Sequence, residues 1–285
     1  MKRIKAILCG IFILATALCL FACGDPVEKI ELEAGITPIE VEHHERTVYG
    51  DAYIPEEEKF PVVIFSHGYN GFQDDFQNEA KLFMSCGVGA ITLTFCGSGA
   101  RDKSGFGTTN MTLFTEKEDL VAVMDYAKRI KGFNGKLFLF GGSQGGMVSA
   151  MAGEERQKDV KGMILLYPGL SIPDDWNNRV YPVNQYPTYE SIPAQFDYWG
   201  VVLGRDFAWT LRDFDIYANM SQFKKPVLIM HGTKDDLVPL AYSRRAAATY
   251  PNAELLVYEG AGHGFTPTSI PDAKEKMLDF VFENL

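Results

Sequence analysis

The sequence predicts an α/β fold with a mostly parallel, doubly wound sheet and a cap inserted between two of its strands. Short apolar, β-branched segments alternate with segments of helical periodicity, as crossover connections require. The apolar segments are nearly continuous, which is typical of parallel strands buried on both faces. Residues 170–223 separate two strands by far more than an ordinary connection, and this interval predicts the cap.

Each element is assigned from the spacing of its apolar residues. A continuous run such as P-V-V-I-F-S-H at 61–67 predicts a buried strand, whereas apolar residues three and four apart, as at 75–85, predict a helix. The second helix is expected to begin with a capping box formed by Thr115 and Glu118. In chain order, strands are expected at 61–67, 88–95, 136–141, 163–167, 226–231 and 254–258, and helices at 75–85, 115–131, 143–153, 240–249 and 271–284.

Residues 1–22 are expected to be a signal peptide. Lys2, Arg3 and Lys5 precede an apolar run at 6–21, which is shorter than the roughly 20 residues of a bilayer span and typical of a secretory signal. The run ends in L-F-A-C-G-D, which resembles the lipobox of bacterial lipoproteins and implies lipidation of Cys23. We expect an exported protein, lipid-anchored to the bacterial cell envelope. The alternative is an ordinary signal peptide with Cys23 incidental.

The remainder divides into two parts. Residues 23–45 are acidic without a strong period, and we expect a tether leading into an edge strand. Residues 46–285 are expected to form one domain, with the cap insertion at 170–223. The insertion holds all three tryptophans, so we expect a cap with its own small core over one end of the sheet. Those residues are Trp176, Trp199 and Trp209.

Charge and cysteine content exclude some functions. A formal net charge of −10 argues against a nucleic-acid partner. Cys86 and Cys96 flank a predicted strand, which at about 3.3 Å per residue holds them too far apart for a disulfide. We expect free thiols, and with no cysteine–histidine cluster in the sequence we expect no metal and no cofactor.

Ser143 lies in G-G-S-Q-G, which satisfies the pattern G-x-S-x-G. It follows the predicted strand F-L-F and precedes a predicted helix, where a sharp turn can project a nucleophilic serine from the sheet edge. Glycines two residues on either side would let the backbone approach closely. The alternative is a glycine-rich turn with an incidental serine.

A nucleophilic serine needs a base and an orienting acid, in the chain order serine, acid, histidine for this type of turn. Only His231 and His263 follow Ser143. His263 lies in the glycine-rich loop G-A-G-H-G-F after a predicted strand, so we expect it to be the base. His231 is expected to hold the loop that presents the acid. That loop offers Asp235 and Asp236.

An oxyanion formed at this serine would need two amide donors. The first is the backbone amide of Gln144, which follows the serine. The second is expected from Tyr69, in the loop S-H-G-Y-N-G-F at 66–72. His67 precedes Ser143 in the chain, so it is expected to brace this loop.

These motifs resemble the α/β-hydrolase superfamily across about residues 45–285. H-G-x-x-D-x-x-V-P is similar to the acid loop of that superfamily, and the resemblance implies that Asp235 is the acid. H-G-Y-N-G, G-G-S-Q-G-G, H-G-T-K-D-D-L-V-P and G-H-G-F together look most like the bacterial cinnamoyl (feruloyl) esterases, which carry a lid in the interval matching 170–223. One departure is Thr94, where that group commonly has aspartate. Dienelactone-hydrolase-like and prolyl-peptidase-like enzymes share the order of the triad.

The resemblance implies a serine esterase that cleaves a small-molecule ester, such as a hydroxycinnamoyl ester of a sugar or alcohol. Ser143, Asp235 and His263 would form the catalytic triad, with Tyr69 and Gln144 as oxyanion donors. Two alternatives remain: a serine peptidase acting on short peptides, and a non-catalytic lipoprotein that uses the fold for binding. We expect contact with the membrane only through the lipid anchor, and the sequence leaves the oligomeric state open.

Overall fold

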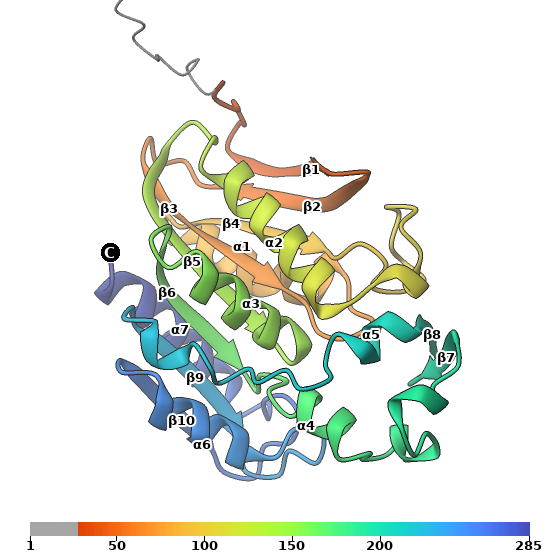
Figure 1. The fold of residues 1–285 in the computed structure, drawn as a ribbon. Coiled ribbons are helices and arrows are strands. Elements are labelled where there is room, and N and C mark those ends of the chain that lie inside the picture. Colours follow the sequence, from red (N-terminus) through yellow and green to blue (C-terminus); the bar gives the residue numbers. More distant parts are fainter. Residues whose placement is uncertain (1–27) are drawn as a thin grey trace, which may run out of the picture.

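The computed structural model describes residues 28–285, so the predicted signal peptide and Cys23 lie outside the described residues. An eight-stranded sheet has the order β1-β2-β4-β3-β5-β6-β9-β10 (Figure 1). All neighbouring strands from β4 to β10 in this order pair in parallel. The pairs β1–β2 and β2–β4 are antiparallel. The strands are β1 (Gly35–His43), β2 (Arg46–Ile54), β3 (Phe60–Ser66), β4 (Gly89–Thr94), β5 (Phe133–Gly142), β6 (Val160–Leu166), β9 (Val227–Gly232) and β10 (Ala253–Tyr258).

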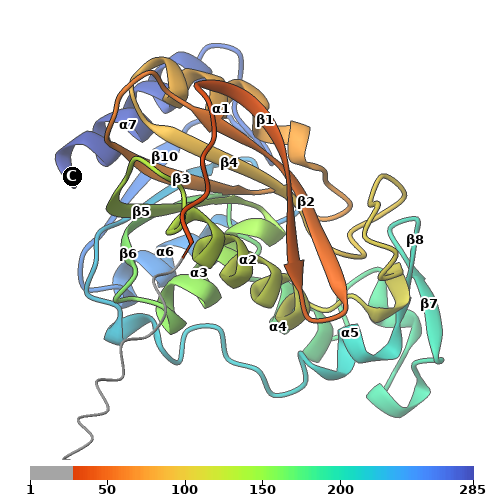
Figure 2. The same ribbon diagram turned by 90° about the horizontal axis from the view of Figure 1, so that it is seen from above.

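Helices cover both faces of the sheet (Figures 1 and 2). One buried apolar cluster joins the sheet to α2, α3 and α6, and a second joins it to α1 and α7. Within residues 28–285, no helix is both long and apolar enough to cross a bilayer. The helices are α1 (Gln77–Ser85), α2 (Leu113–Ala127), α3 (Gln144–Glu155), α6 (Leu240–Thr249) and α7 (Ile270–Glu283).

The expected fold class is confirmed, because the sheet is mostly parallel, is covered on both faces and carries an insertion. Strands β3 and β4 are buried at every position, as their continuous apolar runs indicate. The sequence did not predict β2. It pairs with β1, the edge strand expected from the acidic segment.

The expected capping box was wrong. Helix α2 begins at Leu113, and its cap is Thr112, whose backbone is extended. The hydroxyl of Thr112 accepts the Thr115 amide at 3.1 Å, and the hydroxyl of Thr115 accepts the Thr112 amide at 2.9 Å. Thr115 is therefore the third residue of the helix rather than its cap. Glu118 faces Arg46 instead.

The insertion gathers beyond the carboxyl ends of the central strands (Figure 1). Trp176 is fully buried, with its ring centroid 5.4 Å from those of Phe196 and Tyr198 and 5.9 Å from that of Phe207. This aromatic core is not separate, because it is continuous with the apolar cluster around α2 and α3. Besides short 3-10 turns, the insertion contains α4 (Ile172–Asn177), β7 (Gln195–Tyr198), β8 (Val201–Gly204) and α5 (Arg205–Trp209).

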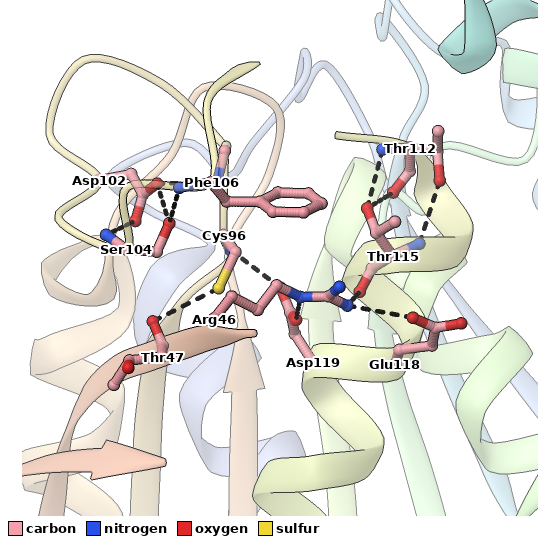
Figure 3. A network of polar contacts seen from close by, with 11 residues as sticks. Arg46, Thr47, Cys96, Asp102, Ser104, Phe106, Thr112, Thr115, Glu118 and Asp119 are labelled. Carbon is pink, nitrogen blue, oxygen red and sulfur yellow. Dashed lines mark hydrogen bonds and ion pairs between the residues drawn. The ribbon is translucent and has the colours of Figure 1, made fainter. Parts of the chain in front are cut away.

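Arg46 joins the start of β2 to helix α2 and to the loop after β4 (Figure 3). Its guanidinium donates to Asp119 at 2.6 Å and to the Thr115 carbonyl at 3.1 Å, and it lies 4.7 Å from the ring centroid of Phe106. The amide of Cys96 donates to the same Asp119 carboxylate at 2.9 Å. The expectation of free thiols is confirmed for the described cysteines, of which Cys86 is exposed and Cys96 buried.

Candidate active site

Ser143 occupies a tight turn between β5 and α3. Its backbone has φ 54° and ψ −124°, a conformation that non-glycine residues seldom adopt. The flanking glycines are required by close backbone approach. A Cβ added at Gly141 would lie 2.2 Å from the Gly145 carbonyl oxygen, and one at Gly145 would lie 2.3 Å from the carbonyl oxygens of Ser66 and His67. The turn therefore leaves the Ser143 side chain partly exposed at the edge of the sheet.

The fold brings Ser143, His263 and Asp235 together from the ends of β5, β10 and β9. Nε2 of His263 lies 2.8 Å from the Ser143 hydroxyl oxygen, and Nδ1 of His263 lies 2.8 Å from Oδ2 of Asp235. The His263 side chain is 19% exposed, whereas that of Asp235 is fully buried. This is the geometry of a nucleophile, a base and an orienting acid, in which the base is reachable from outside.

The carboxylate of Asp235 is held on both oxygens. Oδ1 accepts the amides of Leu237 and Val238, each at 2.9 Å, and Oδ2 lies 3.1 Å from Nε2 of His231. Burial alone would raise the pKa of Asp235, but hydrogen bonds from His231, His263 and Val238 outweigh it and lower the pKa below its usual range. Asp235 is therefore ionised at neutral pH.

The geometry selects Asp235 over Asp236, because the Asp236 side chain is exposed and it is Asp235 that contacts His263. His231 is buried below the loop, where it donates through Nε2 to the Val238 carbonyl at 2.9 Å and accepts the Ser243 hydroxyl at 2.7 Å. It braces the acid loop, as the sequence predicted.

The loop after β3 lies against the turn that carries Ser143. Ser66 pairs with Gly141, and a Cβ added at Gly68 would lie 3.2 Å from Cβ of Ser143. Among residues 28–285, neither the Tyr69 amide nor the Gln144 amide donates a hydrogen bond. Both amides expected as oxyanion donors are thus unpaired: that of Gln144 directly follows the serine, and that of Tyr69 follows Gly68 in the loop that contacts it.

His67 braces this loop from a buried position. Its Nε2 accepts the Phe95 amide at 3.0 Å, so Nδ1 carries the proton and donates to the Gly68 carbonyl at 2.7 Å. Burial lowers the pKa of His67 to about 4, which keeps the imidazole neutral. The side chain of Tyr69 joins the loop to the cap, because its hydroxyl donates to the Tyr198 carbonyl at 2.5 Å.

Two further residues, which the sequence did not predict, adjoin the site. Tyr167 follows β6, and its ring centroid lies 4.7 Å from that of His263. Glu116, on α2, is fully buried and accepts the side-chain amide of Gln144 at 2.9 and 2.8 Å. No motif marks either residue, because each reaches the site from a different element.

The Gln144 contact bears on substitution at that position. Because the Gln144 side chain is buried against Glu116, it has a packing role besides the role of its backbone amide.

In residues 28–285, the only cluster of potential metal ligands is His43, His44 and Glu118, which includes none of the residues above.

Comparison with known proteins agrees with this fold. The sequence profile of the prolyl oligopeptidase family matches residues 75–285. Est1E of Butyrivibrio proteoclasticus, solved with ferulic acid bound, superposes with a TM-score of 0.77 at 23% identity, covering 86% of this chain and 98% of that one. A putative hydrolase of Agrobacterium vitis superposes with a TM-score of 0.69 at 20% identity, covering 88% of this chain and 100% of that one. These likenesses show an α/β-hydrolase fold.

The chain is also similar in sequence to known enzymes. The chain is 43% identical over 109 residues to the non-heme chloroperoxidase CPO-A1 of Kitasatospora aureofaciens, covering 36% of this chain and only 38% of that relative's length. It is 22% identical over 265 residues to a bifunctional esterase/perhydrolase of Acinetobacter calcoaceticus, covering 78% of this chain and 91% of that relative. The relatives thus include hydrolases and haloperoxidases.

Proposed function

The chain belongs to the prolyl oligopeptidase family and is an α/β-family hydrolase; from this premise we propose that it is a serine esterase acting through an acyl-enzyme. The observation that carries the proposal is the continuous contact from Ser143 through His263 to Asp235, at 2.8 Å for each step. A serine hydroxyl is a weak nucleophile unless such a base is aligned with it.

In the first half of the proposed reaction, the Ser143 oxygen attacks the ester carbonyl as its proton passes to Nε2 of His263. Asp235, held ionised by its hydrogen bonds, balances the charge that forms on the imidazole. The amides of Tyr69 and Gln144 donate to the developing oxyanion. His263 returns the proton to the leaving alcohol as the carbon–oxygen bond breaks.

In the second half, water attacks the acyl-enzyme while His263 accepts a proton from it. Collapse of the second tetrahedral intermediate releases the carboxylic acid and returns the proton to Ser143. Besides the substrate and water, each proposed step uses only side chains and amides around Ser143, so the proposed reaction needs no cofactor.

A hydroxycinnamoyl or other aromatic acyl group is the substrate that we propose. Supporting this are the four motifs similar to the cinnamoyl esterases and the likeness to Est1E, solved with ferulic acid. The cap also contributes Tyr198, whose ring centroid lies 5.3 Å from that of Tyr69, the residue whose backbone amide is a proposed oxyanion donor.

The test is turnover of p-nitrophenyl acetate and methyl ferulate by the wild type and by Ser143→Ala. We expect the substitution to abolish both activities while the far-ultraviolet circular dichroism spectrum is unchanged. Retained turnover by a folded Ser143→Ala protein would overturn the mechanism.

A peptidase acting on short peptides is the second candidate, and the family match favours it. Aminoacyl-nitroanilides assayed beside methyl ferulate separate the two, because the preferred substrate shows the higher kcat/KM. A non-catalytic binding protein is the third. A fluorophosphonate probe that left Ser143 unlabelled would favour that reading.

The location of the protein is part of the proposal. We propose export and lipid attachment at Cys23, on the strength of the signal and lipobox pattern alone. Detergent partitioning of the wild type against Cys23→Ser tests it, since only the lipidated form should enter the detergent phase.

A further inference from the structure

The β1–β2 hairpin turns beside helix α2 (Figure 2). His43 and His44 from this hairpin and Glu118 from α2 form a cluster of potential metal ligands. The ligating nitrogen and oxygen atoms of these three side chains all lie within 4.8 Å of one another. None of the three takes part in the proposed hydrolysis. We propose that they bind a divalent transition-metal ion of the zinc type.

The turn brings the two histidines together. His43 ends β1 and pairs with Arg46, which leaves His44 and Glu45 as a two-residue turn. Successive side chains of a strand point to opposite faces, which would separate neighbouring histidines. His44 instead has φ 51°, in the left-handed region, and the two ring centroids are 4.1 Å apart. The hairpin therefore presents two imidazoles side by side.

His43 supplies a nitrogen that lacks a partner. Its Nε2 is buried and makes no hydrogen bond with any residue in the range 28–285. Such an atom is uncommon, because buried polar groups are nearly always paired. A bound ion would satisfy this nitrogen.

Glu118 supplies a positioned carboxylate. Arg46 donates to its Oε2 at 3.1 Å, and the same guanidinium is fixed by Asp119 at 2.6 Å and by the Thr115 carbonyl at 3.1 Å (Figure 3). Oε1 of Glu118 is left free of this contact. Because Asp119 already balances the charge of Arg46, the charge of Glu118 remains to offset that of an ion.

The donor set determines the class of ion. Two imidazoles and one carboxylate suit zinc, whereas magnesium and calcium prefer oxygen donors alone. Tetrahedral bonds of about 2.1 Å place ligand atoms roughly 3.4 Å apart, so binding requires a small inward rotation of side chains. His44 is exposed and the Glu118 side chain is 45% exposed, so both can rotate. Water would complete the coordination.

The sequence predicted no metal site, because it contains no cysteine–histidine cluster. This donor set was not visible there, since the histidines and Glu118 lie on segments far apart in the chain. The ion would tie the edge hairpin to α2, so metal binding should also raise the thermal stability of the protein.

The experiment titrates the full chain with Co²⁺ as a spectroscopic substitute for Zn²⁺, followed by calorimetry with Zn²⁺ itself. We expect one ion per chain, visible d–d bands without thiolate charge-transfer bands, and a higher Tm with zinc. His44→Asn should abolish binding without unfolding the protein, because His44 is exposed and asparagine tolerates the left-handed conformation. Glu118→Gln should weaken binding at least about tenfold.

Two controls make the outcome decisive. Glu45→Gln removes one negative charge from the same turn without removing a ligand, so it should bind zinc as the wild type does. His263→Ala should also retain the ion. Loss of binding in His263→Ala, thiolate bands with Co²⁺, unchanged binding in His44→Asn, or no binding at all would each overturn the proposal.

Discussion

Ser143 has a strained backbone, and the atoms around its turn leave no room for a side chain at the glycine two residues after it. Its left-handed φ of 54° costs on the order of 1–3 kcal/mol, which the surrounding structure must hold in place. The carbonyl oxygens of Ser66 and His67 approach Gly145 so closely that any Cβ there would collide with them. The glycines are thus part of what positions the hydroxyl.

Gly145→Ala is predicted to displace the turn. A displacement of about 1 Å should lower kcat roughly 100-fold, and overpacking should lower the free energy of unfolding by about 1–3 kcal/mol. Steady-state kinetics and urea denaturation measure the two effects. Gly262→Ala is the control, because its Cβ would meet only the Lys234 oxygen at 3.6 Å. Equal losses in the two variants would contradict the steric account.

Asp235→Asn and Asp236→Asn form a matched pair. Only Asp235 contacts His263, so Asp235→Asn should lower kcat about 10⁴-fold by disturbing the orientation and charge balance of the imidazole. Asp236→Asn should leave kcat within about twofold, as expected of a surface residue away from the reacting atoms. Ester hydrolysis at saturating substrate measures both. A greater loss in Asp236→Asn would reassign the acid.

Glu116 predicts a pH dependence of stability. Burial raises its pKa to about 8 from 4.5, against the opposing hydrogen bond from Gln144. The folded state therefore binds more protons than the unfolded state between those values, so the free energy of unfolding should fall as pH rises through that window.

Glu116→Gln should flatten this profile, because glutamine does not ionise. Urea denaturation across the same pH window measures it, with Glu275→Gln, an exposed glutamate on α7, as the control. Parallel profiles for the wild type and Glu116→Gln would show that Glu116 does not carry the pH dependence.

The sequence predicted Ser143 as the nucleophile, His263 as the base and the loop that carries the acid, because their chain order and their positions after strands leave few alternatives. It left Asp235 and Asp236 to be separated by resemblance, and the fold separates them through burial. Glu116 and Tyr167 were not predictable, since their contacts with Gln144 and His263 depend on how α2 and β6 pack.

At the scale of elements, burial decided which segments could be predicted. Helix α6 begins and ends at the predicted residues, and the central strands differ from prediction by a few residues at their ends. Strand β2 escaped because it pairs next to the sheet edge and is only partly buried along its first half. The cap was predicted as an insertion, but its continuity with the main core depends on tertiary packing.

Tyr69→Phe tests the connection between the loop after β3 and the cap. The substitution keeps the backbone amide but removes the hydrogen bond to the Tyr198 carbonyl, worth about 1 kcal/mol. We predict about a five- to tenfold loss in kcat/KM for methyl ferulate, because the loop that carries the proposed oxyanion donor loses a support.

Thr108→Val is the control for that loss. Tyr198 lies in β7 and Val202 in β8, so both belong to the β7–β8 hairpin of the cap. Thr108→Val removes another hydrogen bond to this hairpin, from the Thr108 hydroxyl to the Val202 carbonyl at 2.5 Å, away from the loop after β3. It should lower stability with little effect on kcat/KM. The same kinetic loss in both variants would attribute the effect to the hairpin as a whole.

At the scale of the whole molecule, the parallel sheet explains how residues 120 positions apart come into contact. The carboxyl ends of β5, β9 and β10 lie at one edge, so the loops after them converge there. This convergence was predictable from the alternation of strands and helices. The hairpin beside α2, which creates the proposed metal site, was not, because one of its strands was missed.

The central claim is that Ser143 forms the covalent intermediate. The most direct measurement is mass spectrometry of the protein treated with a fluorophosphonate, followed by peptide mapping. We predict one adduct per chain, on the peptide containing Ser143, formed far more slowly in His263→Ala. An adduct on another residue, or no adduct on a folded protein that still turns over esters, would contradict the account.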